Sequence, residues 1–183
     1  MPKAQMDKKY NPGRVEKRWY KAWLEADLFI ADNHSEKEPF TILIPLPNIT
    51  GSLHIGHALN NTLQDLITRK WRMDGREALW IPGIDHAGIS TQIKVEQYLA
   101  KKGIFKEKIG RERFEKECWK WKEKYGGIIL EQLKRLGASC DWSRLAFTLD
   151  EARSTAVNEA FLHYYKEGLI YRGHYIVNWC PPL

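Results

Sequence analysis

The sequence has no long apolar run. None of its 183 residues lies in a stretch that approaches the roughly 20 apolar residues needed to span a bilayer, and residues 1–19 contain no apolar core of signal-peptide length. Cysteine is scarce: Cys118, Cys140 and Cys180 lie far apart, and no pair has the spacing of zinc ligands. These absences predict a cytoplasmic protein with reduced thiols, no membrane contact and no protein-bound metal.

The charge balance is basic. Lysine and arginine total 29 against 23 aspartate and glutamate residues, a net charge of +6, and the isoelectric point is near 9.2. This excess favours polyanionic partners such as nucleotides or RNA. A hydrophobic fraction of 43% with eight tryptophans excludes a disordered chain and is typical of a folded domain with a sizeable core.

The first half of the chain alternates between strand and helix patterns. Residues 14–29 predict an amphipathic helix with Val15, Trp19, Trp23 and Leu24 on one face. "PFTILIPLP", residues 39–47, predicts a buried strand at the heart of a sheet. Apolar residues then recur at helical spacing up to Gly75, a second short strand follows at residues 77–82, and another helix is expected at residues 88–102. This order predicts an α/β fold with a parallel strand–helix–strand unit and a right-handed crossover.

The second half is more helical. Residues 111–136 form a charged helical pattern, and the pair Gly126-Gly127 predicts a break in it. A further helix is expected at residues 150–167, with Asp150 or Thr148 as its N-cap. The tail, from residue 169 onward, is strand-like in composition before a double proline.

The most informative stretch is "PNITGSLHIGH", which lies between the first strand and the helix that follows it. Gly51 permits a tight turn, and Thr50 or Ser52 is suited to cap the helix. Helix N-termini attract phosphate, and His54 and His57 share one helical face. Their imidazoles can donate hydrogen bonds to charge that develops on an α-phosphate in a transition state. The alternative is that these histidines only cap the helix or bind a metal.

A carboxylate occupies the corresponding place after the second strand. Asp85 lies in "PGIDHAGISTQ", at a strand end and between glycines. Because the carboxyl ends of parallel strands meet at one edge of a sheet, we expect Asp85 to lie near the same crevice and to hold an ammonium group. The alternative is an Asx-turn or an N-cap for the next helix.

Together these segments resemble the N-terminal catalytic part of valyl-tRNA synthetases, which are class I aminoacyl-tRNA synthetases. "PNITGSLHIGHALNNTLQDLITRKWRMDG" is similar to their HIGH signature and its helix, and "LWIPGIDHAGISTQ" resembles their GTDHAGIATQ segment. "WKWKEKYGGIILEQLKRLGASCDWSR" and "YYKEGLIYRGHYIVNWCP" extend the similarity over nearly the whole chain. The resemblance implies a Rossmann-like, doubly wound parallel sheet. It also implies formation of valyl-adenylate from valine and ATP, with Mg²⁺ accompanying ATP, followed by transfer of valine to tRNA(Val).

The resemblance also implies roles for residues of this sequence. His54 and His57 would be catalytic, and Gly56 would face the adenine. The implied ATP contacts are Thr50, Gly51, His54, Gly56, His57 and Asn60. The implied valine contacts are Pro45, Pro47, Asn48, Asp85 and His86. Arg69, Lys70 and Arg72 are expected to form a solvated face, with contact to a tRNA acceptor stem as the alternative.

The sequence departs from the family pattern in several places. Pro45-Leu46-Pro47 stands where the family has three prolines, and Ile84 replaces a usual threonine. The family's KMSKS signature is missing, and so is its editing insertion. We therefore expect no threonine editing and activity well below that of a complete enzyme. The alternative function is a non-catalytic nucleotide- or tRNA-binding half-module; a HIGH-type nucleotidyltransferase that acts on another substrate is disfavoured by the valine-like segment.

The resemblance predicts three parts of the chain. They are an N-terminal helical arm (1–38), the first half of a Rossmann-like catalytic domain (39–173), and a strand leading towards the editing insertion (174–183). Full-length members of the family are expected to be monomers. A half-sheet exposes an edge and apolar surface, so this chain alone is expected to self-associate.

Overall fold

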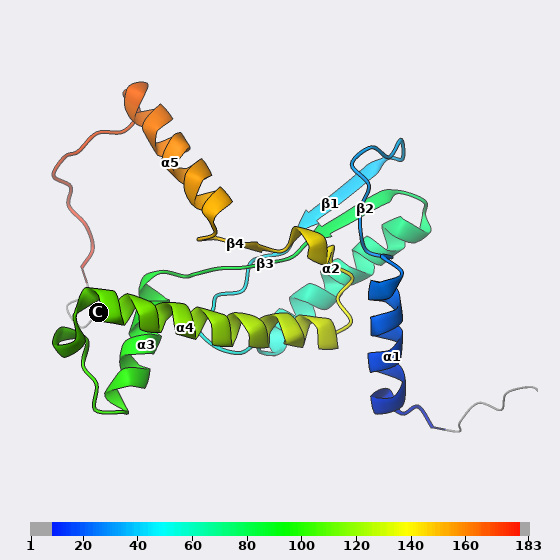
Figure 1. Ribbon diagram of the computed structural model, residues 1–183. Helices are drawn as coiled ribbons and strands as arrows, with labels where there is room; N and C mark the ends of the chain where they lie inside the picture. Colours follow the sequence, from blue (N-terminus) through cyan, green and yellow to red (C-terminus); the bar gives the residue numbers. More distant parts are fainter. Residues whose placement is uncertain (1–8, 180–183) are drawn as a thin grey trace, which may run out of the picture. The chain divides into compact units, whose positions relative to one another are not determined.

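The computed structural model describes residues 9–179, and the chain divides into two compact units, one ending at Thr148 and the other beginning at Leu149 (Figure 1). Helices and short parallel strands build the first unit. In the part of the second unit that is described, one helix is the regular element. Within residues 9–179 no helix combines the length and the apolar character needed to cross a membrane.

The N-terminal arm is a helix, α1, over Pro12–Glu25. It contacts the rest of the first unit through Tyr20, whose hydroxyl donates to the carbonyl of Ala138 at 2.8 Å and accepts from Trp142 Nε1 at 2.9 Å. The predicted helix is confirmed, but Trp19 is exposed and does not belong to the packed face. The reason is that α1 turns the tyrosine, one position further on, towards the body of the unit.

A parallel strand–helix–strand unit follows the arm. Strand β1 (Pro39–Leu43) leads through a loop to helix α2 (Ile55–Met73), which returns the chain to strand β2 (Glu77–Ile81). The two strands pair in parallel along their whole length. Figure 1 shows them side by side, with α2 next to β2. The predicted α/β class and the parallel pairing are confirmed.

The prediction that β1 lies at the heart of a sheet is wrong for the described residues. The side chains of β1 alternate between exposed and half-buried, and Leu43 is 60% exposed. Among residues 9–179, β2 is the one strand that pairs with β1, so one edge of β1 has no neighbouring strand. The apolar stripe of α2 is also exposed. Its members are Ile55, Leu59, Leu63, Leu66, Ile67 and Met73.

Beyond β2 the chain forms a second short parallel pair, β3 (Gly83–Ile84) with β4 (Ala146–Phe147). The main core lies around these strands and contains eight buried residues: Ile44, Ile49, Trp80, Ile84, Ile129, Leu133, Ala138 and Cys140. Each large apolar side chain buried there stabilises the fold by about 1.5–3 kcal/mol. Because Ile44 and Ile49 belong to this core, the loop that follows β1 is anchored at its start and at its middle.

Two helices complete the first unit, α3 (Ile89–Ala100) and α4 (Lys106–Arg135). The predicted break at Gly126-Gly127 is wrong, since α4 continues through both residues and departs from helical geometry at Gly110 instead. Gly126 serves close packing: a Cβ there would lie 2.9 Å from Ile84 Cδ1. A glycine in a helix pattern therefore marks a close approach here.

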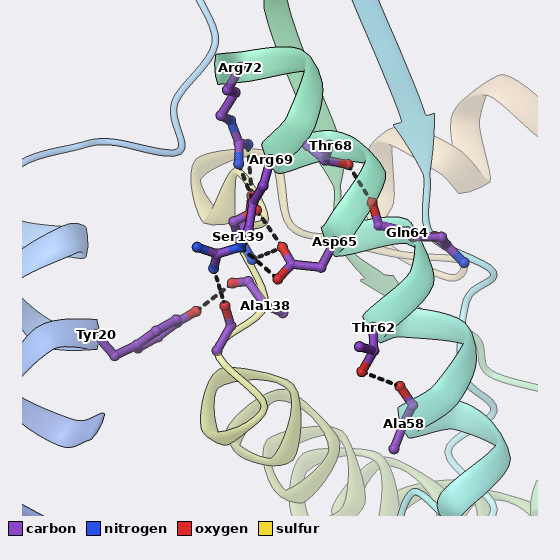
Figure 2. Close-up of polar contacts among 11 residues, drawn as sticks. Tyr20, Ala58, Thr62, Gln64, Asp65, Thr68, Arg69, Arg72, Ala138 and Ser139 are labelled. Atoms are coloured by element: carbon purple, nitrogen blue, oxygen red, sulfur yellow. Dashed lines mark hydrogen bonds and ion pairs between the residues drawn. The ribbon is translucent and has the colours of Figure 1, made fainter. Parts of the chain in front are cut away.

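Polar side chains fasten the C-terminal half of α2 to the segment after α4 (Figure 2). Asp65 accepts hydrogen bonds from the backbone N–H of Ser139 at 2.9 Å and from Arg69 Nε at 2.7 Å. Arg69 also donates to the carbonyl of Gly137, and Arg72 donates to the carbonyl and hydroxyl oxygens of Ser139. Arg69 and Arg72 are thus half-buried structural cations, and the predicted solvated face is wrong for both.

In the second unit, helix α5 covers Glu151–Lys166. Asp150 is its N-cap and accepts from the backbone N–H of Arg153 at 2.9 Å, which confirms the expected cap and excludes Thr148 from that role. The strand expected in the tail is absent from residues 169–179, where the chain is irregular and almost fully exposed. A strand requires a partner strand, and no described segment pairs with this one. Cys180 lies outside the described residues.

Candidate functional site

The loops that follow β1 and β2 run side by side. The backbone N–H of Asp85 donates to the carbonyl of Pro47 at 2.8 Å, and the N–H of Ile49 donates to the carbonyl of Asp85 at 3.0 Å. These bonds make a parallel bridge between Asn48 and Asp85. The structure therefore brings Asn48 and Asp85, two of the five predicted valine contacts, together beyond the carboxyl ends of adjacent parallel strands, where ligands of open α/β sheets bind.

Helix α4 holds the loop that follows β1. Trp121 Nε1 donates to the carbonyl of Ile49 at 2.7 Å, and Gln132 Oε1 accepts from the backbone N–H of Leu53 at 2.9 Å. Both bonds satisfy backbone groups in a segment without regular structure, where an unpaired group would be costly. The path of the loop between β1 and α2 is thus fixed by a helix that lies 70 or more residues later in the sequence.

Helix α2 begins with a cap made by its two histidines. His54 is the N-cap, and its Nδ1 accepts from the backbone N–H of Gly56 at 3.1 Å. His57 Nδ1 accepts in turn from the backbone N–H of His54 at 3.3 Å. The two rings lie 4.0 Å apart between centroids. Because the helix starts at Ile55, the predicted caps Thr50 and Ser52 lie too far upstream, and that prediction is wrong.

The cap determines which ring nitrogens carry protons. A neutral imidazole has one donor and one acceptor nitrogen, and Nδ1 is the acceptor in both His54 and His57. Each Nε2 therefore carries a proton and is a hydrogen-bond donor. His54 and His57 thus do cap the helix, and capping leaves two Nε2–H donors beside a helix N-terminus, a combination suited to an anion.

Partial burial and, secondly, the electrostatic repulsion that a second protonated ring would meet beside His54 lower the pKa of His57 below its usual value of 6.5. The ring is therefore neutral at pH 7, the form that the cap requires. Gly56 contributes by its missing side chain, since a Cβ there would lie 3.0 Å from His54 Cε1 and press on that ring. Gly56 thus preserves the arrangement of the two histidines.

The Asp85 carboxylate is held by its own loop and by the end of β4. Its Oδ1 accepts from the hydroxyl of Thr148 at 2.9 Å and from the backbone N–H of Ala87 at 3.2 Å. The second bond is the Asx-turn expected as an alternative. Thr148 also contacts His86, through the backbone N–H at 2.9 Å and through Nδ1 at 2.5 Å. The side chains of Asp85 and His86 remain about one-third exposed, at 34% and 37%.

The remaining predicted contacts differ in their surroundings. Pro47 is buried and Pro45 is exposed. Thr50 is half-buried, and nothing lies within 4 Å of the position that a Cβ on Gly51 would take. Asn60 is exposed, and its Oδ1 accepts from Gln64 Nε2 at 2.9 Å. The structure thus joins the predicted residues into two groups, the capped start of α2 and the Asn48–Asp85–His86 segment. Among the described residues, no hydrogen bond or ion pair joins the two groups.

Within residues 9–179 no three His, Cys, Asp or Glu side chains are grouped as a metal site would need. Cys118 is half-buried and Cys140 is fully buried, and both are free thiols. Burial raises the pKa of each thiol above its usual value. Neither cysteine is part of the two groups of site residues.

Three residues that contact the site were missed from the sequence, namely Thr148, Trp121 and Gln132. Thr148 follows β4, which at two residues is too short to show a periodic pattern. The sequence pattern therefore indicated only one role for this threonine, that of a helix cap. Trp121 and Gln132 belong to a charged helix, and nothing in that pattern indicates that their polar groups reach a loop 70 or more residues earlier.

Comparison with known proteins places these features in a family. The family model described as tRNA synthetases class I (I, L, M and V) matches residues 18–183. A valine–tRNA ligase from Fusobacterium nucleatum is 55% identical over 177 residues, which cover 97% of this chain and 20% of that protein. The mitochondrial valine–tRNA ligase 1 of Arabidopsis thaliana is 58% identical over 177 residues, covering 96% of this chain and 16% of the relative.

A solved structure shares the fold. It is a ternary complex of the Agrobacterium radiobacter K84 LeuRS with tRNA and LeuAMS, with a TM-score of 0.75 and 24% identity, and the match covers 89% of this chain and 19% of that one. This likeness confirms the predicted Rossmann-like class. The chain spans about one fifth of the length of the curated relatives cited above. Since the family model matches nearly the entire sequence, the chain belongs to the class I tRNA synthetases of the isoleucine, leucine, methionine and valine group.

Proposed function

We propose that this chain forms the ATP- and valine-binding part of a valine–tRNA ligase. The observation that carries the proposal is the placement of a histidine-capped helix start and of Asp85 after two adjacent parallel strands. The choice of valine is supported by relatives named valine–tRNA ligase that are 55% and 58% identical over nearly the whole chain.

ATP binds at the start of α2 in this proposal. The Nε2–H groups of His54 and His57 donate to the phosphates, and the helix N-terminus adds partial positive charge. Thr50, Gly51, Gly56 and Asn60 line the nucleotide. Mg²⁺ accompanies ATP and neutralises phosphate charge. A carboxylate oxygen of valine attacks the α-phosphorus, the bond to the β-phosphate breaks, and pyrophosphate leaves with the electron pair. Donors aimed at charge that grows in the transition state accelerate that step.

Valine binds at the Asn48–Asp85–His86 segment. Asp85 holds the ammonium group through Oδ2, which receives no hydrogen bond from another described residue, whereas Oδ1 receives two. Pro45 and Pro47 contact the rest of the amino acid. The aminoacyl group then passes to the terminal adenosine of tRNA(Val).

A cytoplasmic location stays a prediction, since one relative is mitochondrial.

The test is valine-dependent exchange of pyrophosphate into ATP by this chain. We expect exchange with valine, less with isoleucine and threonine, and none with a His54→Ala, His57→Ala double variant. His34→Ala is the matched control, because His34 is exposed and lies in neither group of site residues. Its exchange should equal that of the parent chain.

Exchange no greater than that of the double variant would reject catalysis by this chain. In that case, ATP binding that persists in a calorimetric titration would favour the alternative, a non-catalytic nucleotide-binding module. Equal exchange with all three amino acids would reject the assignment to valine.

A further inference from the structure

The hydroxyl of Thr148 is the centre of a small hydrogen-bond cluster. It lies 2.9 Å from Asp85 Oδ1, 2.9 Å from the backbone nitrogen of His86 and 2.5 Å from His86 Nδ1. The His86 ring also packs edge-on against Phe147, with centroids 6.4 Å apart and planes at 83°. The imidazole is therefore held by a polar contact at Nδ1 and by an aromatic contact.

The proton count of this cluster determines the tautomer of His86. A hydroxyl has one proton to donate. A carboxylate can only accept a hydrogen bond, and a backbone N–H can only donate one. The Thr148 proton must therefore point to Asp85 Oδ1. The Thr148 oxygen then accepts from the N–H of His86, and the contact to the ring requires a proton on Nδ1. His86 consequently has its proton on Nδ1, and the neutral ring has an acceptor at Nε2.

This tautomer is opposite to that of the two histidines that cap α2. In His54 and His57 the Nδ1 atoms accept backbone protons, so their Nε2 atoms are donors. The proposed phosphate site thus has donor imidazoles, and the proposed amino acid site has an acceptor imidazole. A phosphate needs donors and an ammonium group needs acceptors.

We propose that Thr148 is a positioning residue of the amino acid site, which fixes His86 with Nε2 as an acceptor and turns Asp85 so that Oδ2 remains available to a primary ammonium ligand. The identity of that ligand rests on the proposed function. An ammonium group has three N–H donors, and Asp85 Oδ2 with His86 Nε2 supplies two acceptors on adjacent, partly exposed side chains. Thr148 itself does not contact the ligand.

The first test reads the tautomer directly on the ligand-free chain. Long-range ¹H–¹⁵N spectra of chain labelled at histidine nitrogens, recorded at pH 8, should show the Nδ1–H form for His86 and the Nε2–H form for His54 and His57. Thr148→Val should shift His86 towards the Nε2–H form, and Thr148→Ser should retain the parent spectrum. Thr62→Val is the matched control, because the Thr62 hydroxyl donates to the carbonyl of Ala58 on the surface of α2.

The second test measures ligand affinity by calorimetry, with valine and with its 2-hydroxy analogue, which lacks the ammonium group. Thr148→Val should weaken valine binding by about tenfold or more, the effect expected when a charge-assisted hydrogen bond is lost. Thr148→Ser should restore the affinity. Binding of the hydroxy acid and of ATP should be unchanged in both variants.

The outcomes separate this inference from the proposed function. An Nε2–H form of His86 in the parent chain, or a tautomer unaffected by Thr148→Val, would overturn the positioning role even if valine binds. Equal weakening of valine and of its hydroxy analogue would overturn the ammonium assignment. If the parent chain binds no valine while His86 shows the expected tautomers, the proposed function fails and the role of Thr148 in setting the tautomer stands. Should Thr148→Val not fold, the parent spectrum still decides the tautomer, and the serine variant shows whether a hydroxyl is sufficient.

Discussion

At the scale of single residues, the histidines of this chain show how backbone geometry selects ring chemistry. His54 and His57 use Nδ1 to satisfy N–H groups at the start of α2, where a helix leaves donors without partners. The same bonds place protons on the outer ring nitrogens. Structural and functional interpretations of this motif are therefore compatible, because capping occupies one nitrogen of each ring and leaves the other for a ligand.

The lowered pKa of His57 gives a prediction for the pH dependence of folding. A histidine whose pKa is lower in the folded than in the unfolded state binds fewer protons when folded, so its contribution to stability is present above about pH 6.5 and is lost as pH falls through the lower, folded value. We expect the urea midpoint of the parent chain to fall between pH 7.5 and pH 5. His57→Asn retains an acceptor oxygen but cannot titrate, and its midpoint should fall less. An equal fall in both proteins would contradict the assignment.

At the scale of elements, α2 is positioned by polar contacts. Asp65, Arg69 and Arg72 tie its C-terminal half to Ser139 and Gly137 (Figure 2), while its apolar stripe is exposed. Burial lowers the pKa of Arg72, although Asp65 opposes this effect. The helix that presents His54 and His57 is thus fixed in direction by a network at its opposite end.

Asp65 on α2 and Asp74, the C-cap of that helix, allow a matched test of this network. Asp65→Asn removes a charge that accepts from Ser139 and Arg69, and we expect a loss of about 2–3 kcal/mol in the free energy of unfolding. Asp74→Asn is the control, because Asp74 forms a surface ion pair with Lys70, also four residues away, and such pairs contribute about 0.5 kcal/mol or less. Urea denaturation measures both. Similar losses would mean that the buried network adds nothing beyond a surface pair.

At the scale of the whole molecule, helices and strands with a residue pattern of their own could be predicted from the sequence. The contacts between segments that are distant in the sequence could not. The parallel unit from β1 to β2 follows the strand and helix patterns of its sequence, and helix α5 begins at the expected N-cap, Asp150. The role of Gly126 could not be predicted, because it is set by close packing against a tertiary neighbour, Ile84, and not by a break in the helix. In the site, the motif residues were found from spacing and resemblance. Thr148 was missed as a site residue because its partners are more than 60 residues away.

The exposed stripe of α2 and the open edge of β1 lead to a prediction for the chain in solution. An apolar surface of this kind favours association, so we expect apparent mass on size exclusion to rise with concentration. Leu63→Lys should shift the profile towards the monomer, because it places a charge within the stripe. Leu28→Lys, at an exposed residue outside α2, should have no effect. A monomer at all concentrations would contradict the prediction.

The two bonds from α4 to the loop after β1 restrict which changes of length the chain can tolerate. Trp121 and Gln132 are 11 residues apart, which is about three helical turns and roughly 16 Å. Their side chains therefore leave the same side of α4. One residue inserted between them would rotate the second contact by about 100°, and the backbone of Leu53 would lose its acceptor. Substitutions on the outer face of this segment preserve that spacing, whereas insertions and deletions do not. The spacing between Trp121 and Gln132 therefore determines the path of the loop that leads into α2.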